Sequence, residues 1–273
     1  MDDQVNILNK KTAPPQGKKT LVKMVNMSKH FGGVQALKSV DLDLYHNEIL
    51  GLVGDNAAGK STLMKILAGV LLPDEGQIFM EDMPIECKSP KGARSCGIEM
   101  VYQDFALCRN MWVAGNVFLG RELTRGVLGK VLGVLDKKRM INLSERILTE
   151  QNVNIGSCLK AAGALSGGQQ QSIAVARALG FNAKVIIMDE PTASLGVKQA
   201  LRLLELTKKL PGKGVSVIYI THRMQDIFNL CDRVMVLKTG EKVGEFNIKE
   251  TSVDEIVRLM IIGKETNGSQ KTT

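Results

Sequence analysis

Apolar and polar residues follow two different spacings along this chain. From residue 21 to residue 45 they alternate, most clearly over Val40–Tyr45, which predicts antiparallel strands with one face in water. After a turn at 46–47, the run EILGLVG from Glu48 predicts a buried strand. Residues 60–68 have helical spacing and precede Gly69, which predicts a helix that glycine ends.

The second half of the chain alternates between helical and strand-like segments. Helical spacing over 104–159 is clearest in KKRMINLSERILTEQ, where Met140, Leu143, Ile147 and Leu148 form one stripe. The runs VIIMDEP, VSVIYITH and RVMVLKTG predict strands separated by helices, which indicates parallel α/β winding. Ser252, with Glu255 three residues later, predicts a capping box for a short terminal helix. Residues 1–20 and 263–273 lack apolar periodicity and are expected to be a disordered leader and tail.

Composition narrows the classes of function. Apolar residues make up 44% of the chain and aromatic residues only 4%, which argues against a base-stacking nucleic-acid platform. The cysteines are dispersed without a CxxC pair, so we expect reduced thiols and neither a disulfide framework nor a zinc site. No apolar run is long enough to span a membrane, so a membrane role would be peripheral. The formal charge of +8 is scattered, and its richest stretch, 121–146, reads first as a solvated face and alternatively as a contact for anionic lipid or another partner.

The segment GDNAAGKST follows the predicted buried strand and opens the predicted helix. This context is what a phosphate-binding P-loop needs, because backbone N–H groups and the helix N-terminus surround an anion. Lys60 would reach the β- and γ-phosphates of a nucleotide, and the Ser61 hydroxyl would ligate Mg²⁺. The candidate nucleotide-binding residues of this loop are Gly54, Asp55, Asn56, Ala57, Ala58, Gly59, Lys60, Ser61 and Thr62. An ordinary glycine-rich turn is the alternative, and Ala57 stands where such loops usually carry glycine.

Polar residues follow the apolar runs where parallel strands would end. Asp189 would hold Mg²⁺, and Glu190 would polarise an attacking water as general base. His222 ends another such strand and would donate to a γ-phosphate, and Gln103 would supply an amide to the metal or the water. Taken singly, Asp189 and Glu190 are equally consistent with a solvated loop, and His222 is consistent with a structural role. Gln103 by itself carries no information.

Two further features complete the set. Leu165–Gln169 spell LSGGQ, a serine-glycine turn that would open a helix and suit an anion, although the P-loop already provides a phosphate site. Phe31 lies upstream of the P-loop and would stack on a purine, with a core position as the alternative.

In this order, GDNAAGKST, Gln103, LSGGQ, VIIMDEP and His222 resemble the ATP-binding subunit of ABC transporters over residues 21–262. Other P-loop ATPases and GTPases lack LSGGQ. The stretches VQALKSVDLDL, VYQDFALCRNM and the TGEKVGEF hairpin are most similar to single-cassette subunits of bacterial fructose- and ribose-type importers. The resemblance implies an α/β fold: a RecA-like parallel core with an antiparallel β subdomain, and a small helical subdomain at about 104–159 that receives the membrane partner.

The resemblance also implies a mechanism and partners. Two subunits pair head to tail, so that Ser166, Gly168 and Gln169 of one approach the ATP held by Lys60 of the other. Phe31 becomes the adenine-stacking residue, and Gln103 senses both the γ-phosphate and the membrane subunit. ATP and Mg²⁺ are the implied cofactors. The implied partners are a second cassette, transmembrane permease subunits and, indirectly, a periplasmic-type solute-binding protein, with no nucleic acid, at the cytoplasmic face of the inner membrane. Gly196 departs from the family pattern, because many relatives place Asp there.

The alternative is an ABC-type ATPase with a non-transport role, in chromosome maintenance, DNA repair or regulation. The DNA-acting members need a long coiled coil between the P-loop and LSGGQ, and no sustained heptads lie between Lys60 and Ser166. A P-loop kinase or GTPase leaves LSGGQ unexplained. The sequence therefore favours the ATP-hydrolysing subunit of an importer, and the resemblance implies that the solute is a monosaccharide.

Overall fold

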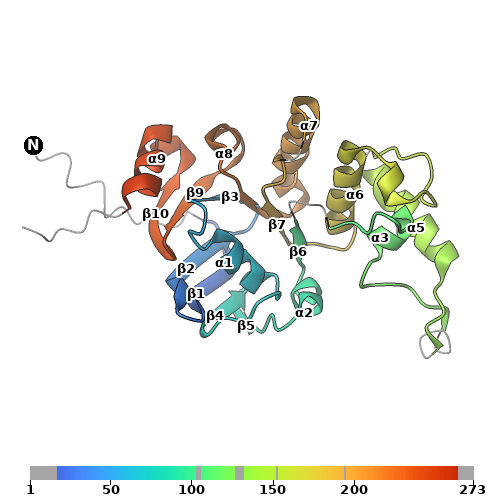
Figure 1. Ribbon diagram of the computed structural model, residues 1–273, viewed down its shortest axis with the longest axis horizontal. Helices are drawn as coiled ribbons and strands as arrows, with labels where there is room; N and C mark the ends of the chain where they lie inside the picture. The colour runs from blue at the N-terminus through green and yellow to red at the C-terminus, as the bar shows by residue number, and fades with distance from the viewer. Residues whose placement is uncertain (1–16, 103–105, 127–131, 152, 194, 264–273) are drawn as a thin grey trace, which may run out of the picture.

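An antiparallel sheet and a mostly parallel sheet form the body of the molecule (Figure 1). The computed structural model describes residues 17–102, 106–126, 132–151, 153–193 and 195–263. The antiparallel sheet has the order β2-β1-β4-β5 and consists of β1 (Thr20–Phe31), β2 (Val34–Tyr45), β4 (Glu75–Met80) and β5 (Met83–Ile85). Alternation over 21–45 therefore predicts β1 and β2 correctly, although β1 begins at Thr20, one residue inside the stretch expected as the leader, and it does not reach β4 and β5.

The second sheet carries the strands that the apolar runs predict. Its order is β10-β9-β3-β8-β7-β6, with β10 antiparallel and the other pairs parallel. The strands are β3 (Ile49–Val53), β6 (Ile98–Val101), β7 (Val185–Asp189), β8 (Ser216–Ile220), β9 (Arg233–Lys238) and β10 (Glu241–Asn247). Strands β3, β6 and β8 are buried along their whole length, which explains their unbroken apolar runs.

Helices lie on the faces and at one end of the parallel sheet (Figure 1). They are α1 (Lys60–Leu67), α2 (Pro90–Ser95), α3 (Val113–Val117), α5 (Lys137–Glu150), α6 (Gly167–Leu179), α7 (Val197–Lys208), α8 (Met224–Leu230) and α9 (Val253–Ile262), with short 3₁₀ turns at Ala162–Ala164, Pro211–Lys213 and Ile248–Glu250. Helix α1 ends at Leu67 and Gly69 follows with φ +70°, as the sequence predicts within one residue.

The cap of α9 differs from the prediction in part. The Ser252 hydroxyl accepts a hydrogen bond from the Glu255 N–H at 3.2 Å, as expected. The Glu255 carboxylate, however, accepts from the Thr251 hydroxyl at 2.7 Å, which takes it away from the reciprocal bond of a capping box. A neighbouring hydroxyl has therefore replaced half of the predicted motif.

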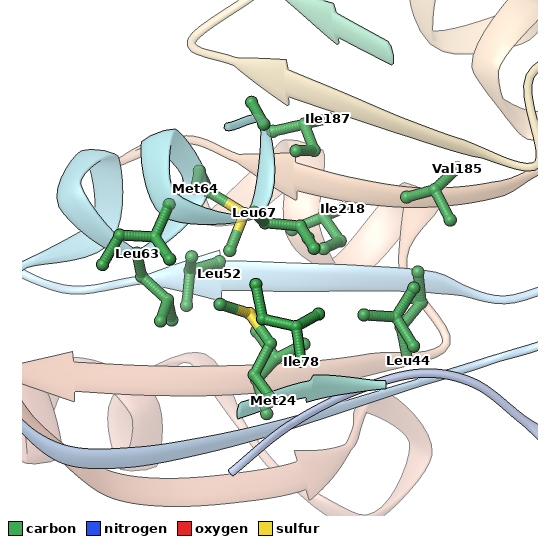
Figure 2. Close-up of a cluster of buried hydrophobic side chains, with 14 of the residues drawn as sticks. Met24, Leu44, Leu52, Leu63, Met64, Leu67, Ile78, Val185, Ile187 and Ile218 are labelled. Carbon is green, nitrogen blue, oxygen red and sulfur yellow. The ribbon is translucent and has the colours of Figure 1, made fainter. Parts of the chain in front are cut away.

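Side chains from both sheets and α1 share the largest cluster of buried apolar residues (Figure 2). Met24, Leu44 and Ile78 come from the antiparallel sheet, and Leu63, Met64 and Leu67 come from α1. Leu52, Val185, Ile187 and Ile218 meet them from the parallel sheet. Because α1 is part of this core, the loop that precedes it is fixed relative to both sheets.

The helical stripe predicted on α5 belongs to a separate cluster at the end of the parallel sheet. Met140, Ile147 and Leu148 are buried there, Leu143 packs partly buried, and Ser144 shares the buried face. Their partners include Val113, Val117 and Phe118 of the α3 region and Ile173 and Ala176 of α6. The helix that follows LSGGQ is thus packed into the helical part of the molecule.

A buried arginine ties the two sheets together. The Arg233 Nε donates to Glu48 Oε1 at 2.7 Å, and its Nη2 donates to the Asp43 carbonyl at 2.7 Å. Its Nη1 pairs with Glu245 at 2.6 Å, and its guanidinium lies over the Tyr45 ring at 4.5 Å from the centroid. Burial raises the pKa of Glu48 even though Arg233 opposes the shift. The network compensates the buried charges of Arg233 and Glu48 and links β9 to the Asp43 carbonyl of β2.

We expect Arg233→Leu to lower the free energy of unfolding by about 3–5 kcal/mol, because Glu48 is left buried without its cation. The loss should shrink as the pH falls, since the raised pKa of Glu48 lets the folded state take up a proton. Chemical denaturation at several pH values would measure both effects. Arg146→Ala is the control, because Arg146 pairs with Glu150 on an exposed face and should cost no more than about 0.5 kcal/mol. Equal losses in the two variants would contradict the role given to Arg233.

Candidate nucleotide-binding site

The loop between β3 and α1 is held against both sheets at two glycines. Gly54 has φ +151°, and a Cβ there would lie 2.2 Å from the Leu237 carbonyl oxygen of β9. Gly59 has φ +100°, and a Cβ there would lie 2.8 Å from the Ala36 carbonyl oxygen of β2. Both positions need glycine for conformation and for space. The predicted strand, loop and helix are all present, and the loop leads directly into the N-terminus of α1, an arrangement that suits an anion.

Ala57 adopts the conformation that the sequence left in question. Its φ is +66°, in the left-handed region, so the alanine is strained where glycine would not be. The residue is exposed at the tip of the loop, next to Asn56 and Asp55, whereas Ala58 is buried.

Lys60 is the first residue of α1 and bends back over the loop. Its Nζ donates to the Gly54 carbonyl at 2.7 Å and to the Asp55 carbonyl at 2.9 Å. Burial lowers the pKa of Lys60, and the charges of Glu190 and Asp189 partly offset that shift. The Lys60 ammonium is therefore close enough to Asp189 and Glu190 to be stabilised by their negative charges.

Asp189 is the last residue of β7, at the carboxyl edge of the parallel sheet. Burial raises the pKa of Asp189, and the neighbouring Glu190 charge raises it further, while a hydrogen bond with the Ser61 side chain and the charge of Lys60 lower it. The structure thus brings Lys60, Ser61 and Asp189 together, although Asp189 lies far from the other two in sequence.

Glu190 follows the strand in a strained conformation. Its φ is +48°, and its N–H donates to the Ile220 carbonyl of β8 at 3.0 Å. His222 Nδ1 lies 3.0 Å from the Glu190 carboxylate. The histidine side chain is 69% exposed and that of Glu190 19%, so the pair faces the open edge of the sheet. The predicted grouping of Glu190 and His222 is therefore present.

Phe31 ends β1, and its side chain is exposed at the tip of the β1–β2 hairpin. Lys29 Nζ lies 5.7 Å from the centre of the ring. The same hairpin carries Ala36, whose carbonyl touches the loop at Gly59. An exposed aromatic on a hairpin that borders the P-loop is available to stack on a base, and the core alternative for Phe31 is wrong.

LSGGQ forms the N-terminal cap of α6. The Ser166 hydroxyl accepts from the Gln169 N–H at 3.3 Å, and the Ser166 N–H donates to Gln169 Oε1 at 3.1 Å, which makes a complete capping box. Gln169 Nε2 also donates to the Asn154 carbonyl at 3.2 Å. The side chain of Gln169 thus holds the turn, while Ser166 and Gly167 are exposed.

The P-loop and the LSGGQ turn, the two candidate phosphate-binding turns, are separate within one chain. Among the described residues, every hydrogen bond of the Ser166 side chain is made to Gln169, and none reaches the P-loop. In the view of Figure 1, α6 lies beyond β6 and β7 from α1. Ser166 therefore has no nucleotide of its own chain to contact in this arrangement.

A contact that sequence reasoning missed joins these regions. The buried Gln171 of α6 donates through Nε2 to the Pro191 carbonyl at 2.7 Å, directly after Glu190. No local pattern signals this bond, because its partners come from different elements. Gln103 lies outside the described residues.

The residues present suit a magnesium-bound triphosphate. Backbone N–H groups of the loop and the Lys60 ammonium would face the phosphates. Ser61 and Asp189 would supply the hard oxygen ligands that Mg²⁺ prefers. No cluster of three or more His, Cys, Asp or Glu that could hold a metal ion occurs among the described residues. In that part of the chain no helix is both long and apolar enough to cross a bilayer.

Comparisons with known proteins agree with this geometry. Residues 37–193 match the family model described as ABC transporter. The chain is 43% identical over 244 residues to a fructose import ATP-binding protein of Rhizobium meliloti, covering 87% of this chain and 92% of that protein. It is 39% identical over 254 residues to a xylose/arabinose import ATP-binding protein of Sulfolobus acidocaldarius, covering 92% and 99%. A ribose import ATP-binding protein of Yersinia pestis is 41% identical over 88% of this chain, which spans 46% of that longer protein.

Solved structures give the same result. A nucleotide-free ATP-binding cassette of an ABC transporter superposes with a TM-score of 0.75 at 26% identity, covering 89% of this chain and 95% of that one. A dimeric cassette in a post-hydrolysis state, bound to ADP and phosphate, superposes with a TM-score of 0.69 at 27% identity, covering 85% and 100%.

We expect Ala57→Gly to raise the free energy of unfolding by up to about 1 kcal/mol, because glycine relieves the left-handed strain. Nucleotide affinity should stay equal or improve. Chemical denaturation and nucleotide titration would measure the two effects. Ala58→Gly is the matched control, since Ala58 is buried and outside the left-handed region, so the change should destabilise the protein. The strain argument fails if both variants lose stability equally.

Proposed function

The chain belongs to the ABC transporter family of ATP-binding proteins, and from that premise we propose that it hydrolyses ATP to energise the import of a monosaccharide. The observation that carries the proposal is the meeting of Lys60, Asp189 and Glu190 at one edge of the parallel sheet. The relatives named for fructose, ribose and xylose/arabinose import support the class of solute.

ATP would lie along the loop with its base at the β1–β2 hairpin. Phe31 stacks on the adenine, and the backbone N–H groups of residues 54–62 surround the phosphates. Lys60 exchanges its carbonyl partners for the β- and γ-phosphates, which is a short movement for a flexible ammonium. Ser61 and Asp189 would hold Mg²⁺, which would neutralise charge on the phosphates. The raised pKa of Asp189 favours a nearby cation, because a positive charge restores the ionised form.

Hydrolysis needs a base in line with the γ-phosphate. Glu190 accepts a proton from a water whose oxygen forms a bond to the γ-phosphorus, and the bond from that phosphorus to the β–γ bridging oxygen breaks to release ADP. His222 Nδ1, 3.0 Å from the Glu190 carboxylate, donates to that carboxylate and orients it, and in the imidazolium form Nε2–H would donate to the γ-phosphate. We assign Gln103 to the metal and the attacking water on the resemblance alone.

The LSGGQ turn (Leu165–Gln169) is proposed to serve a second copy of the chain. Ser166 and Gly168 would approach the γ-phosphate held by Lys60 of the partner subunit, which gives a use to a turn that has no nucleotide of its own. Gln169 would support that contact through the cap. The ATPase would be a peripheral subunit at the cytoplasmic face of the inner membrane. Its partners would be permease subunits, and a solute-binding protein would act through those permease subunits. Residues 21–262 would form the ATPase domain.

Removing the base tests the chemistry. Glu190→Gln should lower turnover by at least about 100-fold and keep ATP binding, so that an ATP-bound dimer accumulates. Phosphate release and size-exclusion chromatography with ATP would measure this. Glu205→Gln is the control, because Glu205 lies on an exposed part of α7. Turnover of Glu190→Gln at the parent rate would overturn the assignment.

Complementation tests the shared site. Ser166→Arg should keep ATP binding by the isolated subunit and abolish hydrolysis, because the arginine fills the space that the partner's phosphate needs. Mixing it with Glu190→Gln should restore part of the activity, since one site of each mixed dimer then joins an intact Glu190 to an intact Ser166. Hydrolysis by Ser166→Arg alone at the parent rate would contradict a site shared between subunits.

A further inference from the structure

Glu190 and His222 meet at an exposed edge, where water competes for both side chains. His222 Nδ1 is 3.0 Å from the Glu190 carboxylate, and the histidine side chain is 69% exposed. Glu190 also has a φ of +48°, a conformation that persists only where the surrounding chain imposes it. Its N–H bond to the Ile220 carbonyl fixes the residue from one side. The chain that follows must therefore fix it from the other.

A buried hydrogen bond joins the segments that follow these two residues. The Thr192 hydroxyl, two residues after Glu190, donates to Asp226 Oδ2 at 3.1 Å. Asp226 lies in the first turn of α8, four residues after His222. Thr192 is 2% exposed and Asp226 is 3% exposed, so water does not compete for this bond. With the contact between Glu190 and His222, it closes a ring of chain that has one bond at the surface and one in the interior.

Further hydrogen bonds stiffen the two arms of this ring. The Asp226 N–H donates to the Arg223 carbonyl at 3.0 Å, and the Arg223 N–H donates to the Thr221 hydroxyl at 3.1 Å. On the other arm, Gln171 Nε2 donates to the Pro191 carbonyl at 2.7 Å. A displacement at the buried bond would thus reach the exposed pair over a few residues.

The polar character of the buried pair indicates a role beyond packing. A carboxylate is costly to bury, and the Arg223 guanidinium, whose Nε is 3.8 Å from Asp226 Oδ2, is itself 44% exposed. Two apolar residues of similar volume would fill the interior at equal or lower cost. They would lack direction, because a hydrogen bond fixes one segment relative to the other and an apolar contact does not.

We propose that Thr192 and Asp226 are positioning residues, whose buried hydrogen bond sets the distance and orientation between Glu190 and His222. They act only through the base and its histidine, within one chain and one nucleotide site. The inference rests on the proposed function, in which Glu190 is the base and His222 orients it.

Removing the donor and then restoring it separates the bond from the packing around it. Thr192→Val keeps the volume of the side chain and should lower kcat about tenfold, because the base is misplaced, while KM for ATP stays at the parent value. Thr192→Ser keeps the hydroxyl and should restore most of kcat. Asp226→Asn keeps an acceptor oxygen and should also retain most of it. Steady-state hydrolysis against ATP concentration and nucleotide titration of the isolated subunit measure these effects.

A double substitution separates positioning from stability. Thr192→Val alone should lower the melting temperature, because it leaves the buried carboxylate short of a hydrogen bond. Thr192→Val combined with Asp226→Leu replaces both partners by apolar groups and should regain stability, while kcat stays about tenfold below that of the parent. A merely structural bond would let kcat recover together with the melting temperature.

Thr207→Val is the matched control, since Thr207 is also buried. Its hydroxyl donates to the Leu203 carbonyl at 2.8 Å and contacts Met188 Sδ, and neither partner belongs to the ring. This variant should keep the parent kcat.

The outcomes are distinguishable. If the parent protein does not hydrolyse ATP, the proposed function fails. If it does and Thr192→Val keeps the parent kcat, or if Thr192→Ser is as slow as Thr192→Val, the bond does not position the base. Recovery of kcat together with stability in the double variant would likewise overturn the positioning role.

Discussion

The close approach of the P-loop backbone to two strands is the constraint on which the site depends. Gly54 lies against the Leu237 carbonyl of β9 in the parallel sheet, and Gly59 lies against the Ala36 carbonyl of β2 in the antiparallel sheet. Neither strand leaves room for a Cβ, so the loop is held from both sides before any nucleotide binds. Because α1 is anchored in the core that both sheets share, Lys60 and Ser61 start from fixed positions. The entropy of ordering the loop is therefore lost on folding and not on binding.

Charge compensation then sets the state of the site. Lys60 has its pKa lowered by burial, and Asp189 has its pKa raised by burial and by Glu190, so each group gains from an opposite charge. A bound triphosphate would supply the negative charge beside Lys60, and a divalent cation would supply the positive charge beside Asp189. The strained φ of Glu190 fits this arrangement, since it turns the carboxylate out of the strand line and toward His222.

The sequence predicted the parts that depend on local pattern. Alternation over 21–45 and the apolar runs at β7, β8 and β9 gave the strands, and the glycine spacing gave the P-loop, because periodicity and conformation act over short distances. Assembly of Lys60 with Asp189 followed from the rule that parallel strands end at one edge. The hydrogen bond of Gln171 was not predictable, since it joins different elements through a side chain with no motif. Half of the capping box predicted for α9 was wrong. The Thr251 hydroxyl lies next to the motif and donates to the Glu255 carboxylate, which the prediction had paired with a backbone N–H.

The capping box of α6 also determines how the LSGGQ turn would bind a phosphate from the nucleotide of another subunit. The Ser166 hydroxyl donates to Gln169 Oε1 at 3.3 Å, which is long for a bond between oxygens. A phosphate oxygen arriving at the helix N-terminus would take that proton in a shorter, charge-assisted bond, while the hydroxyl oxygen continues to accept from the Gln169 N–H. Gln169 Oε1 keeps its bond from the Ser166 N–H through the exchange. Since the cap survives, the turn need not unfold to bind, and the binding energy remains available to bring two subunits together.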